Sequence, residues 1–502
     1  MLNKLIEIND IEKKFRKLEN LIIVQCHGVF DILHYGHINY LIFSKKKGDI
    51  LIVTITSDKF VNKGYKRPYF NQLVRAKSLA ALECVDYVCI NNSPTSEDII
   101  KQIKPNFYVK GSDYKSLLST DKNLQLEKKS VEAVGGKLIF SVGKIFSSSS
   151  IINSNFNIFN QKQKEFINKI KKKYSYSYIS NQIDKFSSLK VLLIGEAIID
   201  QYIFCNPVGK SGKEPILINK KIKSEKYAGG ILAVANHLSS FCKEVRVLSY
   251  LGDRQNYYEF IKKSLKKNIK FEYINKNNSP TILKSRYIDN YTKNKIIGLY
   301  DLNDENFDDK DEKLFLRKLE KNISNFDLTL VVDYGHGLIT PKISKFIQKK
   351  SKFLSVNAQL NSLNSSYHSI CKYSKADYIC VHEGELQHEF RSKYEKIESL
   401  ILKLQKKMKT ANIVITQGSK GSISLNKKKF TTCPAFAEKV VDRTGAGDTI
   451  IAVSTLCFKQ KIPDDITLLV GNVSAASTVL HLGTGNSIEK NEILKKIRYI
   501  FK

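Results

Sequence analysis

The sequence predicts an α/β protein with two doubly wound parallel sheets, one in each of two domains. Short apolar runs that suit buried strands alternate with stretches of helical periodicity over residues 21–152, and this alternation begins again at residue 189. The stretch between the two regions is polar and rich in lysine, with little strand pattern. We therefore expect domains at residues 1–153 and 187–502, joined by a polar, helical linker at residues 154–186.

The first domain contains five apolar runs that suit the strands of a parallel sheet. Residues 74–83, between two of these runs, carry apolar side chains at helical spacing. Ligands of a doubly wound sheet bind at the carboxyl ends of its strands, so a site is expected in the loops that follow the runs. The five runs lie at residues 21–24, 50–55, 87–90, 106–109 and 136–142.

The second domain opens with the apolar run at residues 189–194 and contains two segments that break the alternation. Residues 216–223 and 281–300 have the pattern of antiparallel strands with polar turns. Because a small sheet of this kind can cover a bound substrate, we expect a β lid on the second domain.

Cysteine usage and hydropathy indicate a soluble protein of a reducing compartment. The nine cysteines are scattered without a Cys-x-x-Cys pair, and an odd number cannot all form disulfides. No apolar run approaches membrane-spanning length, and the first residues lack a signal-peptide core. We expect a cytoplasmic protein with no membrane contact.

The formal net charge of +33 raises the possibility of a nucleic-acid partner. The lysines, however, are spread over the whole chain in short runs and do not form one long basic arm. We therefore expect no nucleic-acid partner, although a basic nucleic-acid-binding protein on an enzyme-like scaffold stays open as an alternative. Small anionic substrates would gain from the positive field in either case.

Residues 28–37, GVFDILHYGH, lie between a predicted strand and a predicted helix, which is the arrangement of a phosphate site. Gly28 lets the backbone come close to an anion. His34 and His37 are three residues apart, so both imidazoles can point the same way within one helical turn. Two imidazoles beside a helix N-terminus can neutralise phosphates as pyrophosphate leaves a nucleotide.

Two other roles of this histidine pair stay open on the residues alone. The pair could ligate zinc, but the nearby candidates for further ligands are His27 and Cys26, on the strand side. Both histidines could also serve the structure alone.

The same stretch resembles the GxFDxxHxGH signature of the cytidylyltransferase-like nucleotidyltransferases at every fixed position. Residues 109–114 resemble that family's KGxDY loop, and residues 146–152 its serine-rich nucleotide loop. The resemblance is strongest to the adenylyltransferase half of the bifunctional heptose 7-phosphate kinase/heptose 1-phosphate adenylyltransferases; the glycerol 3-phosphate cytidylyltransferases are more distant.

This resemblance implies a Rossmann-like domain in which a sugar phosphate attacks the α-phosphate of ATP or CTP, with Mg²⁺ accompanying the triphosphate. It implies catalytic roles for His34, His37 and Lys45. The implied nucleotide-binding residues are Gly28, Val29, Phe30, Asp31, Arg75, Lys110, Gly111, Asp113, Ser147, Ser148 and Ser149.

Residues 441–449, VDRTGAGDT, form the second strong motif. Two glycines around a small residue, followed by a helix, can form a ring of backbone N–H groups that binds a phosphoryl group. Asp448 can accept the proton of an attacking hydroxyl. The alternative is a tight turn with Asp448 as a helix N-cap.

Residues 187–500 resemble the ribokinase/PfkB sugar kinases, which implies a ribokinase-like fold and an ATP-dependent carbohydrate kinase. The matching segments begin with GEAIID at 195–200, AGG at 228–230 and VDYGHG at 332–337. TQGSKG at 416–421 matches the nucleotide-side glycine turn. The implied sugar-binding residues are Asp200, Gly229, Gly230 and Asp333; those of the nucleotide site and anion hole are Glu385, Thr416, Gly418, Gly421, Thr444, Gly445, Ala446, Gly447 and Asn472, with Glu385 also an indirect Mg²⁺ ligand.

Three departures from the resemblance concern the sugar and the arrangement of the domains. Ala233 stands where the kinases usually have Asn, and His382 replaces the Asn of the NxxE motif, whose glutamate is kept as Glu385. The two domains also follow each other in the order opposite to that of the heptose enzymes.

The sequence therefore predicts a bifunctional, homodimeric enzyme of nucleotide-sugar synthesis. The C-terminal domain would phosphorylate a sugar or sugar phosphate, and the N-terminal domain would couple a sugar phosphate to a nucleoside monophosphate. The alternative is an active nucleotidyltransferase with a non-catalytic kinase-like domain for binding or dimerisation.

Overall fold

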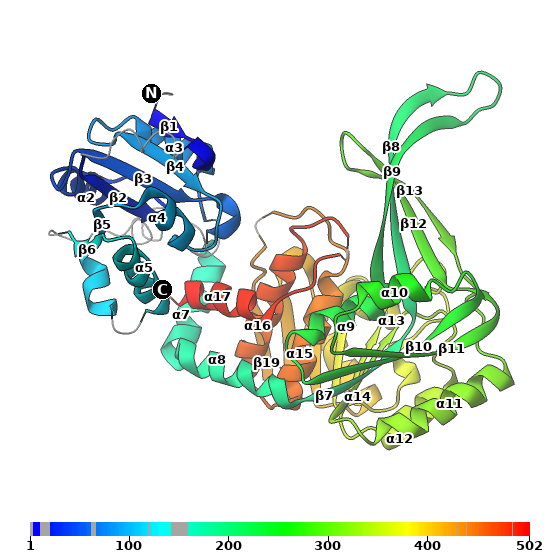
Figure 1. The fold of residues 1–502 in the computed structure, drawn as a ribbon. Coiled ribbons are helices and arrows are strands. Elements are labelled where there is room, and N and C mark those ends of the chain that lie inside the picture. Colours follow the sequence, from blue (N-terminus) through cyan, green and yellow to red (C-terminus); the bar gives the residue numbers. More distant parts are fainter. Residues whose placement is uncertain are drawn as a thin grey trace. The chain divides into compact units, whose positions relative to one another are not determined.

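The chain folds into two compact units, Met1–Asn160 and Gln161–Lys502. The computed structural model describes residues 4–10, 21–61, 67–118, 121–141, 159–427, 429–437, 439–483 and 485–501. Each unit contains a sheet of mainly parallel strands with helices between them, so the predicted fold class is confirmed (Figure 1). No helix in these ranges is long and apolar enough to span a membrane.

The first unit contains a six-stranded sheet with the order β1-β4-β3-β2-β5-β6, in which every neighbouring pair is parallel. The central strands are buried on both faces, which is why they read as continuous apolar runs. The elements are β1 (Leu5–Ile6), β2 (Ile23–Gly28), α2 (Tyr35–Lys45), β3 (Ile50–Thr56), α3 (Gln72–Ala80), β4 (Tyr87–Asn91), α4 (Glu97–Ile103), β5 (Phe107–Lys110), α5 (Lys122–Ala133) and β6 (Lys137–Phe140).

All five predicted strands of this unit are present, as β2 to β6, and the predicted helix corresponds to α3. Strand β2 begins two residues later than predicted and runs on to Gly28, so it delivers that glycine directly to the following turn. The sequence pattern missed β1, because two residues that pair along the edge of β4 are too few to give a periodicity.

The main sheet of the second unit has nine strands in the order β11-β10-β7-β14-β15-β16-β17-β18-β19. It is parallel from β11 to β17, and β18 and β19 add two antiparallel pairs. These strands are β7 (Lys190–Gly195), β10 (Glu244–Arg254), β11 (Ile269–Pro280), β14 (Leu328–Asp333), β15 (Leu354–Ala358), β16 (Tyr378–His382), β17 (Asn412–Thr416), β18 (Ser422–Asn426) and β19 (Lys429–Cys433).

A second, four-stranded sheet extends from the body of this unit (Figure 1). Its order is β13-β12-β8-β9, and its strands are β8 (Ala197–Lys210), β9 (Leu217–Gly230), β12 (Ile282–Asp289) and β13 (Lys295–Asp301). The predicted lid segments correspond to β9, β12 and β13. The matched segment at residues 195–200 crosses from one sheet to the other, because β7 ends at Gly195 and Asp200 belongs to β8 of the lid.

The helices of the second unit differ in how deeply they are buried. Helices α15 and α16 are buried almost all round, whereas α11, α12 and α17 bury only one face. The helices are α7 (Gln161–Lys173), α8 (Tyr176–Asp184), α9 (Ile231–Ser239), α10 (Tyr258–Ser264), α11 (Asp309–Ile323), α12 (Pro341–Lys350), α13 (Glu383–Glu389), α14 (Ile397–Met408), α15 (Ala446–Lys459), α16 (Asp464–Thr478) and α17 (Lys490–Ile500).

Candidate functional sites

The second unit contains a cavity of about 480 Å³ at the carboxyl ends of β15, β16 and β17. The N-terminus of α15 closes one part of it, and side chains of α16 line another. Its wall is made by Asn357, Gln359, Cys380, Val381, His382, Glu385, Thr416, Gly418, Ser419, Gly421, Ala435, Phe436, Ala437, Val440, Arg443, Gly445, Ala446, Gly447, Asp448, Ile450, Asn472, Ala475, Ala476 and Val479.

The first turn of α15 presents backbone N–H groups to this cavity. Gly445 precedes the helix with φ +83°, a conformation that strains any side chain, and a Cβ on Gly447 would meet open space. The orphan N–H groups and the dipole of a helix start favour an anion here. Thr444, predicted for the anion hole, is not part of this wall; its N–H and its hydroxyl both donate to Oδ1 of Asp442.

The carboxylate of Asp448 lies in the first turn of α15 but does not cap the helix, so the N-cap alternative is wrong. Its Oδ1 accepts hydrogen bonds from Nε2 of Gln359 at 2.7 Å and from the hydroxyl of Tyr334 at 3.2 Å. Burial raises the pKa of Asp448 to about 6, against the opposing effect of these two hydrogen bonds. A carboxyl group with this pKa is mostly ionised at neutral pH and is able to accept a proton.

Asp200 and the glycine pair meet at the base of the lid. Oδ1 of Asp200 accepts from Nη1 of Arg286 at 2.5 Å, and a Cβ on Gly229 would lie 2.1 Å from Oδ2 of Asp200. Gly230 has φ +56° and lies against the carbonyl of Glu196, so neither glycine position has room for a side chain.

Two basic residues of β12 belong to this region and were missed from the sequence. Lys284 is the register partner of Asp200, and Arg286 lies two residues further along the same strand. Burial lowers the pKa of Lys284, and Asp200 opposes this change. No local motif marks these residues, because only the pairing of β8 with β12 brings them to the predicted sugar side.

Asp333, predicted to bind sugar, does not line the cavity. Its carboxylate is fully buried and accepts from the hydroxyl of Tyr373 at 2.7 Å, with the ammonium of Lys372 2.5 Å away. Burial opposes ionisation, but Lys372, His368 and the Tyr373 hydrogen bond outweigh it and hold the pKa of Asp333 below its usual value. The neighbouring residue, Tyr334, is the one that reaches Asp448.

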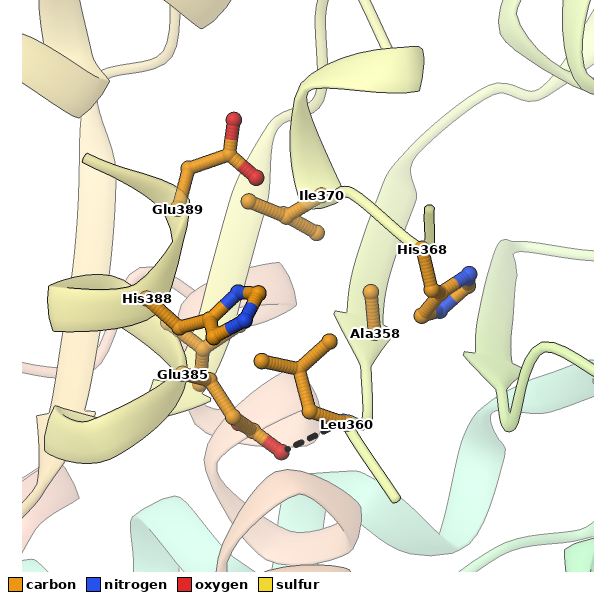
Figure 2. Close-up of a pocket in the computed structure, with 8 residues that line it drawn as sticks. Ala358, Leu360, His368, Ile370, Glu385, His388 and Glu389 are labelled. Atoms are coloured by element: carbon orange, nitrogen blue, oxygen red, sulfur yellow. Dashed lines mark hydrogen bonds between the residues drawn. The ribbon is translucent and has the colours of Figure 1, made fainter. Parts of the chain in front are cut away.

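Glu385 contacts two backbone segments at the cavity wall. Its Oε1 accepts from the N–H of Leu360 at 3.1 Å, as Figure 2 shows, and its Oε2 accepts from the N–H of His382 at 2.6 Å. Burial raises the pKa of Glu385 to about 7. His382, which departs from the kinase motif, caps α13 by accepting from the N–H of Gly384.

A much smaller cavity, of about 10 Å³, lies beside Glu385. Its wall is made by Ala358, Leu360, His368, Ile370, Val381, Glu385, His388 and Glu389, drawn in Figure 2. This volume holds about one water molecule, so we assign no organic ligand to it.

Four of the residues predicted for the nucleotide side line one part of the large cavity, namely Thr416, Gly418, Gly421 and Asn472. Gly418 and Gly421 have φ +55° and +100°, and a Cβ on Gly421 would lie 2.0 Å from the carbonyl oxygen of Cys433. Thr416 ends β17 next to this turn, and Asn472 donates to the hydroxyl of Ser422 at 2.6 Å. The side chains of α16 and Phe436 give this part of the cavity an apolar wall suited to a flat base.

In the first unit the structure brings the two motif histidines together. His34 caps α2 by accepting from the N–H of Gly36 at 3.1 Å, and its ring is stacked on that of His37 with the centroids 4.0 Å apart. Phe30 packs edge-on against His37 and has φ +45°, a strained conformation for an aromatic residue. His27 is turned to the hydroxyls of Thr54 and Thr56, at 2.9 and 3.3 Å.

Asp31 and Arg75, predicted to bind nucleotide, both form hydrogen bonds to neighbouring protein segments. Asp31 accepts from Nε of Arg67 and from the N–H of Phe70. The guanidinium of Arg75 donates to the carbonyls of Val29, Thr56 and Phe70 and to Asp58. Within the described ranges, Nη1 and Nη2 of Arg67 are buried and have no hydrogen-bond partner. Arg67 is therefore a further candidate for binding a phosphate group.

Lys45, which is expected to be catalytic, belongs to the same helix that begins at the histidine pair. It is the last residue of α2, at the end of the helix opposite His34, and its ammonium pairs with Asp86 at 2.6 Å. Lys110 is paired with Glu127 at 2.7 Å at the end of β5, next to Gly111. The side chain of Asp113 and residues Ser147, Ser148 and Ser149 lie outside the described residues.

Two family models match the chain. The model of the pfkB family carbohydrate kinases matches residues 188–491, which is more than half of the chain. The chain therefore belongs to the pfkB carbohydrate kinase family. A second model, described as cytidylyltransferase-like, matches residues 26–180.

Curated relatives match parts of the chain. Bifunctional protein HldE of Campylobacter jejuni (strain RM1221) is 28% identical over 298 residues, which are 59% of this chain and 62% of the relative. Bifunctional protein HldE of Aliarcobacter butzleri (strain RM4018) is 45% identical over 132 residues, 26% of this chain and 28% of the relative. The chain thus matches less than two thirds of the length of these curated relatives.

Among solved structures, phosphofructokinase-2 from Escherichia coli in complex with potassium aligns with a TM-score of 0.51 at 12% identity. The alignment covers 62% of this chain and 100% of that chain. At this level of identity the likeness concerns the fold of the kinase part alone.

Proposed function

We propose that residues 187–502 transfer the γ-phosphoryl group of ATP to a hydroxyl of a sugar or sugar phosphate. The observation that carries the proposal is the buried carboxylate of Asp448 at the start of α15, in the wall of the large cavity. Its pKa of about 6 suits a base at neutral pH, and the adjoining N–H groups suit the charge of the transferred group. Membership of the pfkB carbohydrate kinase family supports the same reaction.

The acceptor sugar would lie between Asp448 and the base of the lid. Asp200 would accept a hydrogen bond from a second sugar hydroxyl, since it comes close enough to Asp448 to raise the pKa of that side chain. Lys284 and Arg286 add positive charge beside Asp200 and would favour an acceptor that carries an anionic group.

The donor nucleotide would occupy the rest of the cavity, with its base against α16 and its phosphates toward Gly445, Ala446 and Gly447. Two oxygen-bearing side chains fit an accompanying Mg²⁺ ion: Glu385, and Asn357, whose buried Oδ1 accepts no hydrogen bond from the described residues. They would hold Mg²⁺ through its water molecules, and the ion would neutralise phosphate charge.

We propose that residues 1–153 transfer a nucleoside monophosphate from ATP or CTP to a sugar phosphate and release pyrophosphate. The stacked rings of His34 and His37 at the start of α2 support this role, because they place two imidazoles at a helix N-terminus. Nη1 and Nη2 of Arg67, which have no partner among the described residues, suit a phosphate beside the same turn.

The two reactions fit one route, in which the kinase product is the substrate of the nucleotidyl transfer. The HldE relatives are named bifunctional proteins, which supports a shared role of both parts. Nine free thiols, most of them buried, further support a cytoplasmic setting.

We also propose that the lid pairs with the lid of a second copy. Apolar side chains are exposed along it, among them Val208, Leu217, Ile297 and Leu299, each more than 60% accessible. A second copy would present the same surface, as a two-fold dimer requires. Light scattering should give a dimer mass, and replacing Leu217 and Leu299 by Glu should give a monomer; a wild-type monomer would contradict the proposal.

One assay tests both activities. Purified wild-type protein is incubated with ATP, CTP and a panel of sugars, sugar phosphates and sugar 1-phosphates, and ADP and pyrophosphate are measured separately. We expect ADP with at least one sugar or sugar phosphate, and pyrophosphate with at least one sugar 1-phosphate. Pyrophosphate without ADP across the panel would favour a non-catalytic, kinase-like C-terminal domain.

A further inference from the structure

Among the residues that the structure describes, two donate hydrogen bonds to one carboxylate oxygen of Asp448 and none to the other. Gln359 and Tyr334 both donate to Oδ1. No residue that the structure describes donates to Oδ2, and the side chain forms part of the cavity wall. An oxygen that already accepts two hydrogen bonds is the weaker base of the pair, so the two oxygens are not equivalent.

The two donors come from different segments, and one amide connects them. Nδ2 of Asn364 donates to the carbonyl of Tyr334 at 2.8 Å and to the carbonyl of Gln359 at 3.1 Å. Asn364 is 3% exposed, and its own Oδ1 accepts from the N–H of Asn361. The spacing between the two donor residues is therefore fixed by a buried side chain that touches neither Asp448 nor the cavity.

Further contacts fix each donor separately. The N–H of Tyr334 donates to the buried carboxylate of Glu196 at 3.0 Å, and the N–H of Gln359 donates to the carbonyl of Asp333 at 2.9 Å. Gly335 has φ +70°, and a Cβ there would lie 2.4 Å from Nδ2 of Asn364. The backbone around both donors is thus closely constrained.

We propose that Tyr334, Gln359 and Asn364 form a positioning unit that occupies Oδ1 of Asp448 and reserves Oδ2 for the proton of the acceptor hydroxyl. The inference rests on the proposed kinase reaction. In that reaction the hydroxyl O–H bond breaks and its proton passes to Oδ2 while the oxygen bonds to the γ-phosphorus. The bond from that phosphorus to the bridging oxygen breaks, and ADP leaves with the electron pair.

Several charged groups also act on Asp448 and must be kept constant in a test. Asp200 of β8 raises its pKa and Lys284 of β12 lowers it, and Glu385 of α13 is coupled to it electrostatically. Tyr334 stays protonated, because burial and Asp448 hold its own pKa well above the usual value. It is therefore a hydrogen-bond donor throughout the working range.

The experiment measures kcat/KM of phosphoryl transfer against pH for wild type, Tyr334→Phe, Gln359→Leu and Gln359→Lys. Loss of either donor removes support for the carboxylate, so the acid limb should move up by about half to one pH unit, with kcat reduced roughly tenfold. Gln359→Lys keeps a donor and adds positive charge, so the acid limb of its pH profile should move to lower pH. Asn364→Ala should lower kcat more than it raises KM.

Tyr373→Phe is the matched control, since it removes an equally buried hydroxyl that donates to Asp333 instead of Asp448. Its acid limb should stay in place. If Tyr334→Phe and Gln359→Leu also leave the limb in place in an active enzyme, the positioning unit is refuted while the kinase function stands.

A wild type without kinase activity would refute the proposed function but not decide this point. The titration of Asp448 is then followed directly by NMR of protein labelled with ¹³C at the aspartate carboxyl, with the signal assigned by its loss in Asp448→Asn. A higher pKa of Asp448 in Tyr334→Phe and Gln359→Leu supports the positioning unit, and an unchanged pKa refutes it.

Discussion

Gly229 lies so close to Asp200 that a Cβ on the glycine would be 2.1 Å from Oδ2 of the aspartate. Strand β9, which carries the glycine, is the antiparallel partner of β8, which carries the aspartate. The carboxylate therefore lies directly over the glycine. This is the physical reason for the glycine at position 229.

Replacing Gly229 by Ala should displace the carboxylate of Asp200 and disturb the acceptor side of the kinase site. We expect phosphoryl transfer to fall by about two orders of magnitude, as for other lost positioning contacts. ATP binding, measured by calorimetry, should be nearly unchanged. Gly212→Ala, where a Cβ meets nothing within 4 Å, is the matched control, and equal losses in both variants would contradict the argument.

Asp448→Asn keeps the size of the side chain and removes the proton acceptor. Phosphoryl transfer should fall by roughly two to four orders of magnitude. Nucleotidyl transfer from a supplied sugar 1-phosphate should continue, because its proposed site lies in the first unit. Retention of a tenth or more of the kinase activity would argue against Asp448 as the base.

The same substitution should also change stability in a pH-dependent way. Burial raises the pKa of Asp448 from 3.8 to about 6, so ionisation destabilises the folded state above that range. The variant should then be more stable than wild type by about 2–3 kcal/mol above pH 6.5, and the difference should disappear below about pH 4. Urea unfolding at pH 4 and pH 8 measures this, and an unchanged difference at the two pH values would count against the buried, raised-pKa state.

His34→Ala and His37→Ala should each reduce pyrophosphate release by about two orders of magnitude or more. Phosphoryl transfer should be retained in both proteins, so a loss of both activities would indicate misfolding instead. Full nucleotidyl transfer in both variants would remove the assignment of these histidines.

Lys45→Ala tests whether Lys45 is catalytic, as the family resemblance implies, or only forms an ion pair with Asp86. Its ammonium pairs with Asp86, and both side chains are about one third exposed, so the loss of stability should be no more than about 1 kcal/mol. Pyrophosphate release should change little, since the residue ends α2 far from the histidines. A loss as large as that of His34→Ala would restore a catalytic role for Lys45.

The sequence by itself determined the fold class, the two motifs and the histidine geometry. Buried parallel strands give continuous apolar runs, and a glycine turn before a helix gives a phosphate site, so both are local patterns. The spacing of His34 and His37 was sufficient to predict that both imidazoles can point the same way, because residues three apart are neighbours over one helical turn.

Only the tertiary structure decided which side chains share a site. Lys284 and Arg286 reach Asp200 through strand pairing, and Tyr334 and Gln359 reach Asp448 across 114 and 89 residues of chain. Long-range contacts of this kind also give Asp333, Arg75 and Lys45 partners within the protein. A motif gives the residue type at a position, but the hydrogen-bond partners of a buried polar group come from whichever elements the fold packs against it.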